Sequence, residues 1–138
     1  MKVRDMMTAN VPYCLPSDMA PQAARIMMDM GAGGIVPIVD NKQDSKLIGI
    51  VTDRDLWLEL ERRDSRSVRV SDCMIAPVIS CSPDDDVERA VDCMCDHEVL
   101  SIPVIDEDHR IQGMVSIGDV LHRSEIVAAK AYEALKKR

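Results

Sequence analysis

The 138-residue chain carries one pattern twice, and this internal repeat constrains its fold more than any other feature. Asp5-Met6-Met7 returns as Asp72-Cys73-Met74, an offset of 67 residues. Further matches at this offset are Val11 with Val78, Cys14 with Cys81, Pro16 with Pro83, Ala23 with Ala90, and Met27 with Met94. The offset shrinks to 66 at Pro37 and Pro103 and to 64 at Gly49 and Gly113, which places the extra residues of the first copy in loops. A long period with two copies excludes a solenoid and predicts two similar units packed about a pseudo-twofold axis.

Both copies predict the element order β-α-β-β-α, an α/β (α+β) fold class with helices on one face of a small sheet. In the first copy the expected elements are a strand at 11–15, a helix from about Asp18, strands at 35–39 and 47–52, and a helix from about Arg54. In the second copy they are a strand at 78–81, a helix from about Asp84, strands at 102–105 and 111–116, and a helix from about Gly118. The two motifs are therefore expected at 1–64 and 68–123, followed by a helical extension at 124–138.

The last helix is predicted to run to the C-terminus, because no Gly or Pro follows Gly118. Its apolar stripe consists of Val120, Val127, Ala131 and Leu135. This stripe fits two alternatives: the helix lies on its own domain, or it forms a dimer contact.

Charge and composition exclude several classes of function. The formal net charge is −7, which disfavours binding to nucleic acid or to an anionic membrane surface, since both require a cationic face. Aromatic residues make up 2%, too few for a platform on which single-stranded bases stack. The sequence shows no membrane-spanning stretch and no signal peptide, and its five cysteines have no paired spacing. A cytoplasmic protein is therefore expected.

One motif ends the third strand of each copy. It reads Gly49-Ile50-Val51-Thr52-Asp53-Arg54-Asp55-Leu56 in the first copy and Gly113-Met114-Val115-Ser116-Ile117-Gly118-Asp119-Val120 in the second. The opening Val3-Arg4-Asp5-Met6-Met7-Thr8 and the central Val36-Pro37-Ile38-Val39-Asp40 accompany it. With these segments, residues 1 to about 123 resemble a tandem cystathionine β-synthase (CBS) domain pair, also called a Bateman module.

The resemblance implies a regulatory module, not an enzyme, that binds an adenosine-containing ligand in clefts between the two units. AMP, ADP or ATP is the expected ligand, which suits energy sensing, with S-adenosylmethionine or NAD as less favoured choices. In the family, the Thr/Ser and Asp of the motif hold the ribose, which here means Thr52 with Asp55 and Ser116 with Asp119. The resemblance places the adenine near Thr8, Val11, Val36 and Pro37, or near Ile75, Val78, Ile102 and Pro103. It also implies a homodimer, and a separate effector protein is a possible partner.

The first motif is expected to be the better site. An ionised carboxylate accepts hydrogen bonds from the two neighbouring ribose hydroxyls. A helix N-terminus points backbone N–H groups outward, which favours phosphate, and within Thr52-Asp53-Arg54-Asp55 the arginine adds a cation. The second motif has Gly118 in that place.

Two other functions compete with this one. Thr52-x-x-Asp55 and Ser116-x-x-Asp119 also fit the capping box, in which both side chains merely close a helix N-terminus. On that interpretation the protein is a structural dimerisation or scaffold module without a ligand. A small enzyme acting on a nucleotide is the third hypothesis, but no nucleophile–base pair is apparent and no catalytic residue is assigned. No metal site is expected, because Cys93 and Cys95 lie two residues apart on a helix and point to different faces.

Overall fold

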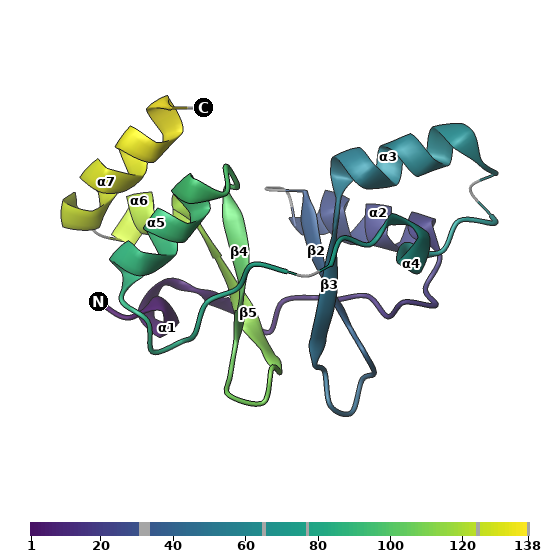
Figure 1. Cartoon of the computed structure of the whole chain (residues 1–138), viewed down its shortest axis with the longest axis horizontal. Coiled ribbons are helices and arrows are strands. Elements are labelled where there is room, and N and C mark those ends of the chain that lie inside the picture. The colour runs from purple at the N-terminus through teal and green to yellow at the C-terminus, as the bar shows by residue number, and fades with distance from the viewer. Residues whose placement is uncertain (31–33, 65, 77, 124, 138) are drawn as a thin grey trace. The chain divides into compact units, whose positions relative to one another are not determined.

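The computed structural model describes residues 1–30, 34–64, 66–76, 78–123 and 125–137 (Figure 1). The chain forms two compact units. Unit 2 is continuous and spans Pro12–Val78, whereas unit 1 combines Met1–Val11 with Ile79–Arg138. The units therefore do not coincide with the two sequence copies, because each unit takes its opening segment from the other copy.

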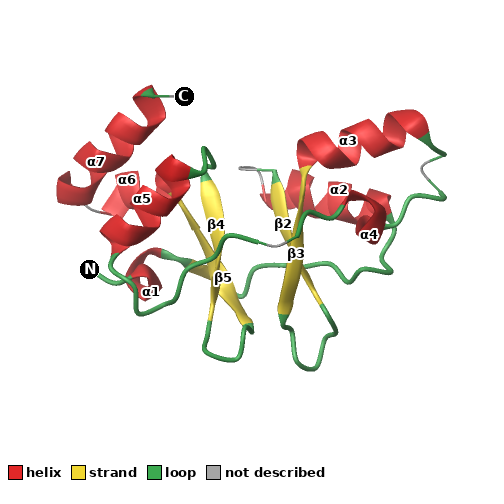
Figure 2. Cartoon of the chain, in the orientation of Figure 1, coloured by secondary structure: helices red, strands yellow, loops and turns green. Residues whose placement is uncertain are grey.

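Unit 2 is a strand hairpin covered by helices (Figure 2). Its elements are α2 (Ala20–Met30), β2 (Ile35–Val39), β3 (Leu47–Thr52), α3 (Asp53–Arg62) and α4 (Val70–Cys73). β2 pairs antiparallel with β3, with Ile35 opposite Thr52. Single bridges add Cys14 in parallel to Ile38 and Ile75 in antiparallel to Ile50. All five residues of β2 are buried, as expected for a short strand with apolar residues on both faces.

Unit 1 repeats this arrangement with one more helix. Its elements are α1 (Val3–Met6), β1 (Thr8–Ala9), α5 (Val87–Asp96), β4 (Ser101–Ile105), β5 (Ile111–Ser116), α6 (Ile117–Arg123) and α7 (Glu125–Lys136). The sheet order is β1-β5-β4, and both pairings are antiparallel. Thr8 lies opposite Met114, and Cys81 bridges in parallel to Val104.

The helical spacing identified in the sequence is confirmed by burial. In α2, Ala20 and Ala23 are fully buried, and in α5 the buried side chains are Val87, Ala90, Val91 and Met94. Each unit therefore has its own apolar core beneath its helices. Both fold as the β-α-β-β-α pattern requires, apart from the first strand, which is reduced to the single bridges at Cys14 and Cys81.

The N-terminal segment completes unit 1. Val3 and Met6 on α1 are fully buried in the same core as Val87 and Met94. Short helices of this size carry too few residues for periodicity to predict, and neither α1 nor its counterpart α4 was expected from the sequence. Lys2 forms an ion pair of 3.1 Å with Asp86 and Arg4 forms one with Asp84, so two of the three consecutive acids at the start of α5 face cations.

The prediction of one helix from Gly118 to the C-terminus is wrong. The segment forms two helices, α6 and α7, and α7 packs against α6 and α5 of its own unit. Ala134 and Leu135 on α7 lie in or beside the core of unit 1, while the side chains of Val127 and Ala131 lie outside those described. This packing corresponds to the first of the two alternatives for the apolar stripe.

Among the described residues, no helix combines the length and the apolar character that crossing a lipid bilayer requires.

Candidate functional site

The junction between β3 and α3 holds the first motif in unit 2. Thr52 is the N-cap of α3, with extended backbone angles, and its Oγ1 accepts the Asp55 N–H at 3.2 Å. The same hydroxyl donates a hydrogen bond of 2.7 Å to Asp55 Oδ2. Thr52 therefore caps the helix and orients the Asp55 carboxylate, which is only half-buried. No hydrogen bond to Asp55 Oδ1 occurs among the described residues, so this oxygen is able to accept one from a ligand.

The first N–H groups of α3 are not available to an anion, contrary to the sequence-based expectation. The Asp53 N–H donates to the Gly34 carbonyl at 2.7 Å, and the Arg54 N–H donates to Asp53 Oδ1 at 2.8 Å. With the Asp55 N–H bound to Thr52, all three groups are satisfied within the protein. The cause is the Asp53 carboxylate, which occupies the helix N-terminus that a phosphate would otherwise occupy.

Gly34 shapes this junction, and sequence reasoning missed it. Its φ is +54°, and a Cβ at this position would lie 2.6–2.9 Å from the carboxylate atoms of Asp53. Only glycine permits both the backbone conformation and the close approach of Asp53. The available signal was a glycine directly before the buried run Ile35–Val39.

The second motif, between β5 and α6 in unit 1, is closed differently. Ser116 Oγ accepts the Asp119 N–H at 3.1 Å, and Asp119 Oδ2 accepts the Ser116 N–H at 3.1 Å. This is a reciprocal capping box, in which the carboxylate is used by the backbone. The Ile117 N–H donates to the Leu100 carbonyl at 2.9 Å, which matches the Asp53–Gly34 bond of unit 2.

The glycine that begins each motif lies beneath a crossing segment. A Cβ on Gly49 would lie 3.0 Å from the Ile75 carbonyl oxygen, and a Cβ on Gly113 would collide with the Thr8 carbonyl oxygen. Each glycine therefore allows the opening segment of the other copy to cross the strand that leads to the motif. The structure thus places Ile75 on unit 2, with Thr52 and Asp55, and Thr8 on unit 1, with Ser116 and Asp119.

The remaining residues expected to line the site fall into two groups. Val36 and Pro37 are buried in β2, and Ile102 and Pro103 are buried in β4, so only their backbone edges are near the junctions. The others, Thr8, Val11, Ile75 and Val78, are exposed or half-buried.

The cysteine and histidine side chains form no larger cluster. Cys93 Sγ lies 3.8 Å from His97 Nδ1 on α5, and His97 Nδ1 lies 2.9 Å from the Cys93 carbonyl oxygen. Burial raises the pKa of the Cys93 thiol, which keeps it protonated at neutral pH. Within the part of the chain that the structure describes, no group of three or more His, Cys, Asp or Glu could hold a metal ion.

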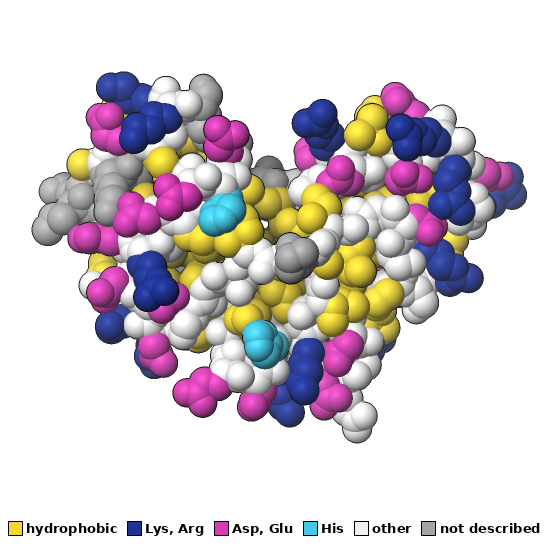
Figure 3. Space-filling view, viewed as in Figure 1, with side chains coloured by type: hydrophobic (Ala, Val, Ile, Leu, Met, Phe, Trp, Pro, Cys, Tyr) yellow, Lys and Arg dark blue, Asp and Glu magenta, His cyan; other side chains and the backbone are white. Residues whose placement is uncertain are grey.

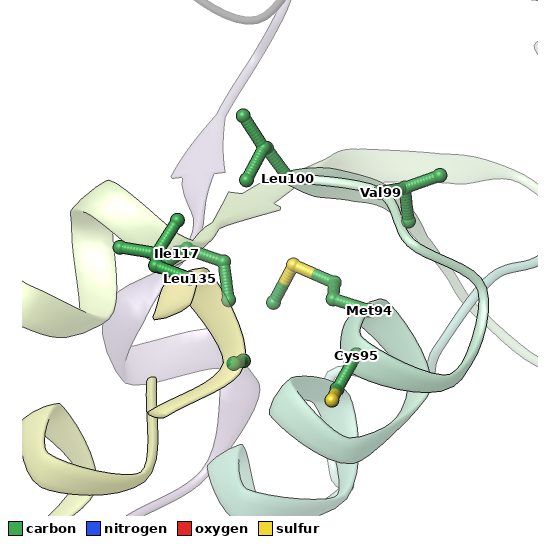
Figure 4. Close-up of a pocket in the computed structure, with 7 residues that line it drawn as sticks. Met94, Cys95, Val99, Leu100, Ile117 and Leu135 are labelled. Atoms are coloured by element: carbon green, nitrogen blue, oxygen red, sulfur yellow. The ribbon is translucent and has the colours of Figure 1, made fainter. Parts of the chain in front are cut away.

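An apolar pocket lies in unit 1 beside α7, with Met94, Cys95, Leu100 and Leu135 among its walls (Figure 4). Its empty volume is about 200 Å³. Pockets for drug-sized ligands occupy roughly 300 to 1,000 Å³ and contain polar groups that orient the ligand. This pocket is smaller and its lining is almost entirely apolar, so it is a packing gap under α7, not a nucleotide site.

Comparison with known proteins assigns the family. Residues 3–56 and 70–125 each match the CBS domain, so the two matches together cover most of the chain. The chain belongs to the CBS domain family. Each match begins in one unit of the structure and ends in the other, because the CBS motif of the sequence includes the exchanged opening segment.

Related CBS proteins match over nearly the full chain. The uncharacterized protein YlbB of Bacillus subtilis is 36% identical over 135 residues, which is 97% of this chain and 88% of that protein. A putative acetoin utilization protein, AcuB, from Vibrio cholerae has a structure with a TM-score of 0.78 and 26% identity, covering 100% of this chain and 97% of that one.

Two further CBS structures share the fold. CBSX2 in complex with AMP has a TM-score of 0.76 at 22% identity, covering 92% of this chain and 98% of that chain. The CBS domain pair of protein MJ0100, in complex with 5'-methylthioadenosine and S-adenosylmethionine, has a TM-score of 0.74 at 23% identity, covering 94% and 98%.

Proposed function

We propose that this chain is a regulatory module that binds an adenosine-containing ligand at its CBS motifs, with AMP, ADP or ATP as the ligand class. The observation that carries the proposal is the Asp55 carboxylate, which Thr52 holds at the start of α3 with Oδ1 unused. Such a carboxylate accepts hydrogen bonds from two adjacent ribose hydroxyls. The adenosine ligands bound by CBSX2 and by the MJ0100 pair support the same class.

The residues of the site have separate roles in this proposal. Asp55 accepts the ribose hydroxyls and Thr52 orients Asp55, while the exposed Arg54 supplies the cation for a phosphate. The adenine contacts the protein near Ile75 and Val78 and along the backbone of Val36 and Pro37. The equivalent set in unit 1 is Thr8, Val11, Ile102, Pro103, Ser116 and Asp119. We rank unit 1 second, because its Asp119 carboxylate is already bonded to the backbone and no cation replaces Arg54.

The regulatory step follows from differential binding. A ligand shifts the equilibrium between two conformations only by the difference in its affinity for them. The output of the module is a change in self-association or in affinity for a separate effector protein, and the chemistry is left to that protein.

The test is a thermal-shift and calorimetric titration with adenosine, AMP, ADP, ATP and S-adenosylmethionine. A ligand at a hundred times its dissociation constant stabilises the folded state by about 2.7 kcal/mol. We expect Asp55→Ala to abolish the shift and the matched Asp119→Ala to retain most of it. No shift with any of these ligands would overturn the proposal, and so would equal binding by wild type and Asp55→Ala.

The scaffold function remains a second candidate because of one observation. The reciprocal bonds between Ser116 and Asp119 account fully for the second motif as a helix cap. A protein in which both motifs only cap helices would lose about 1 kcal/mol of stability in Asp55→Ala and would not respond to nucleotides.

A further inference from the structure

The outer face of α3 is unusually apolar for an exposed helix. Trp57 is 65% exposed and Leu58 is 43% exposed, whereas Leu56, on the opposite side of the helix, is 3% exposed and packs in the core. Arg54 and Glu61 share the outer face, because residues three and four apart are neighbours on a helix. The space-filling view shows hydrophobic side chains at the surface over α3, bordered by acidic and basic ones (Figure 3).

The equivalent helices of unit 1 are covered by the chain itself. There α7 packs against α5 and α6, and Cys95 on α5 lines the apolar pocket beside Ala134 and Leu135 of α7 (Figure 4). The repeat aligns Cys95 with Met28 on α2, which is 82% exposed. Within the described part of unit 2, no helix plays the role of α7, so α2 and α3 keep an apolar face in solvent.

We propose that this face of α2 and α3 docks against the same face of a second copy of this chain. A twofold axis between two copies brings identical surfaces together, so that every contact occurs twice. Trp57 and Leu58 lie at the centre of the contact, where large apolar and aromatic side chains supply most of the binding energy. The inference concerns assembly and does not depend on whether a nucleotide binds.

The charges on α3 favour an antiparallel register with the axis between Trp57 and Leu58. In this register Arg54 faces Glu61 of the partner subunit, because both residues lie three positions from the axis. Neither Arg54 nor Glu61 has an ion-pair partner among the described residues. Each dimer gains two cross-subunit ion pairs, which contribute more to orientation than to affinity. A parallel register would place like charges against each other.

The covering of unit 1 by α7 makes the assembly one-sided. Leu121 on α6 is the repeat counterpart of Trp57 and is 40% exposed, but its helix already packs against α7. Self-association therefore uses unit 2 alone, and it produces a closed dimer, not a chain of copies.

The first experiment measures the oligomeric state of the full chain by sedimentation velocity at tens of micromolar. We expect the wild type to be a dimer and Leu58→Asp to be a folded monomer by circular dichroism, with the dimer dissociation constant raised at least tenfold. The control is Leu121→Asp, a matched substitution at similar exposure in unit 1, and we expect it to remain a dimer. A monomeric wild type, a dimeric Leu58→Asp, or loss of the dimer in Leu121→Asp would overturn the proposal.

A charge exchange tests the register. Arg54→Glu creates two acid–acid contacts per dimer, and Glu61→Arg creates two base–base contacts, so each variant alone should dimerise more weakly than the wild type. Mixing the two variants should restore a heterodimer, since every cross-subunit contact is then between opposite charges. Failure of the mixture to dimerise more strongly than either variant alone would exclude this register.

Discussion

The Thr52 hydroxyl donates to Asp55 Oδ2 at 2.7 Å and accepts the Asp55 N–H at 3.2 Å, so one side chain both caps α3 and aims the carboxylate. Thr52 thus couples the stability of the helix to the geometry of the proposed ribose contact. The Ser116–Asp119 pair lacks this coupling, because its carboxylate turns to the Ser116 N–H.

Thr52→Val tests this coupling, because valine keeps the shape of threonine and removes the hydroxyl. We expect a loss of about 1 kcal/mol in the free energy of unfolding for the missing cap. We also expect weaker nucleotide binding, since the Asp55 carboxylate loses its orientation. Urea unfolding and calorimetry measure the two effects, and Thr52→Ser is the control that retains both bonds. Unchanged nucleotide affinity in Thr52→Val would show that Thr52 does not act through Asp55.

Asp53→Asn should change which ligand the site prefers. The Asp53 carboxylate bonds to the Arg54 N–H at the start of α3, so its negative charge opposes a phosphate in this place. Asparagine keeps an oxygen for the Arg54 N–H and removes the charge. We expect the affinity for AMP to rise relative to that for adenosine, measured by calorimetry at low salt, where screening is weak. The control is Asp108→Asn in the hairpin of unit 1, and an equal change in this control would refute the role of Asp53.

Gly49→Ala and Gly113→Ala should destabilise the protein. Each new Cβ meets a backbone carbonyl of a crossing segment, that of Ile75 or that of Thr8, which cannot rotate away. Overpacking of this kind costs about 1–3 kcal/mol. Gly118→Ala is the matched control, because its Cβ finds nothing closer than the Ser116 Oγ at 3.6 Å and alanine is the better helix former. Urea unfolding compares the three variants, and equal stability of all three would contradict the crossing geometry.

The buried thiols should make the protein less stable in alkali. Burial raises the pKa of Cys14 from 9.0 to about 11, with the Asp18 carboxylate acting in the same direction. Burial raises the pKa of Cys81 to about 12, with Asp85 and Cys93 adding to the effect. Above pH 9 the unfolded chain has lost these protons and the native chain keeps them, so the free energy of unfolding falls as the pH rises. Below pH 9 both states are protonated and the contribution is constant.

Urea unfolding at pH 8 and at pH 10.5 measures this effect. Cys14→Ala and Cys81→Ala should each show a smaller fall between the two pH values than the wild type. A fall of the same size in wild type and both variants would assign the alkaline loss of stability to other groups.

Local pattern predicted the interior of each unit well. The spacing of Ala20 with Ala23, and of Val87 with Val91, predicts helices whose inward faces the structure confirms. Periodicity reports which side of an element is apolar, and this information is contained in a few neighbouring residues.

Partner choice between distant segments was not predictable in this way. The sequence places Thr8 beside the first motif, but Thr8 pairs with Met114 in the other copy. Because the two copies are alike, local propensity fits either pairing, and the crossing over Gly113 selects the observed one only in three dimensions. The same limit applies to Asp53, whose side chain occupies the helix start through a rotamer that no sequence pattern records.

The exchange of opening segments also orders the events of synthesis. Every residue of unit 2 has left the ribosome once position 78 is made, whereas unit 1 needs residues from both extremes of the sequence. Val3 and Met6 therefore emerge first but find their core partners last, when Val87 and Met94 follow. The earliest part of the nascent chain must wait, with its apolar side chains unsheltered, for the latest part to arrive.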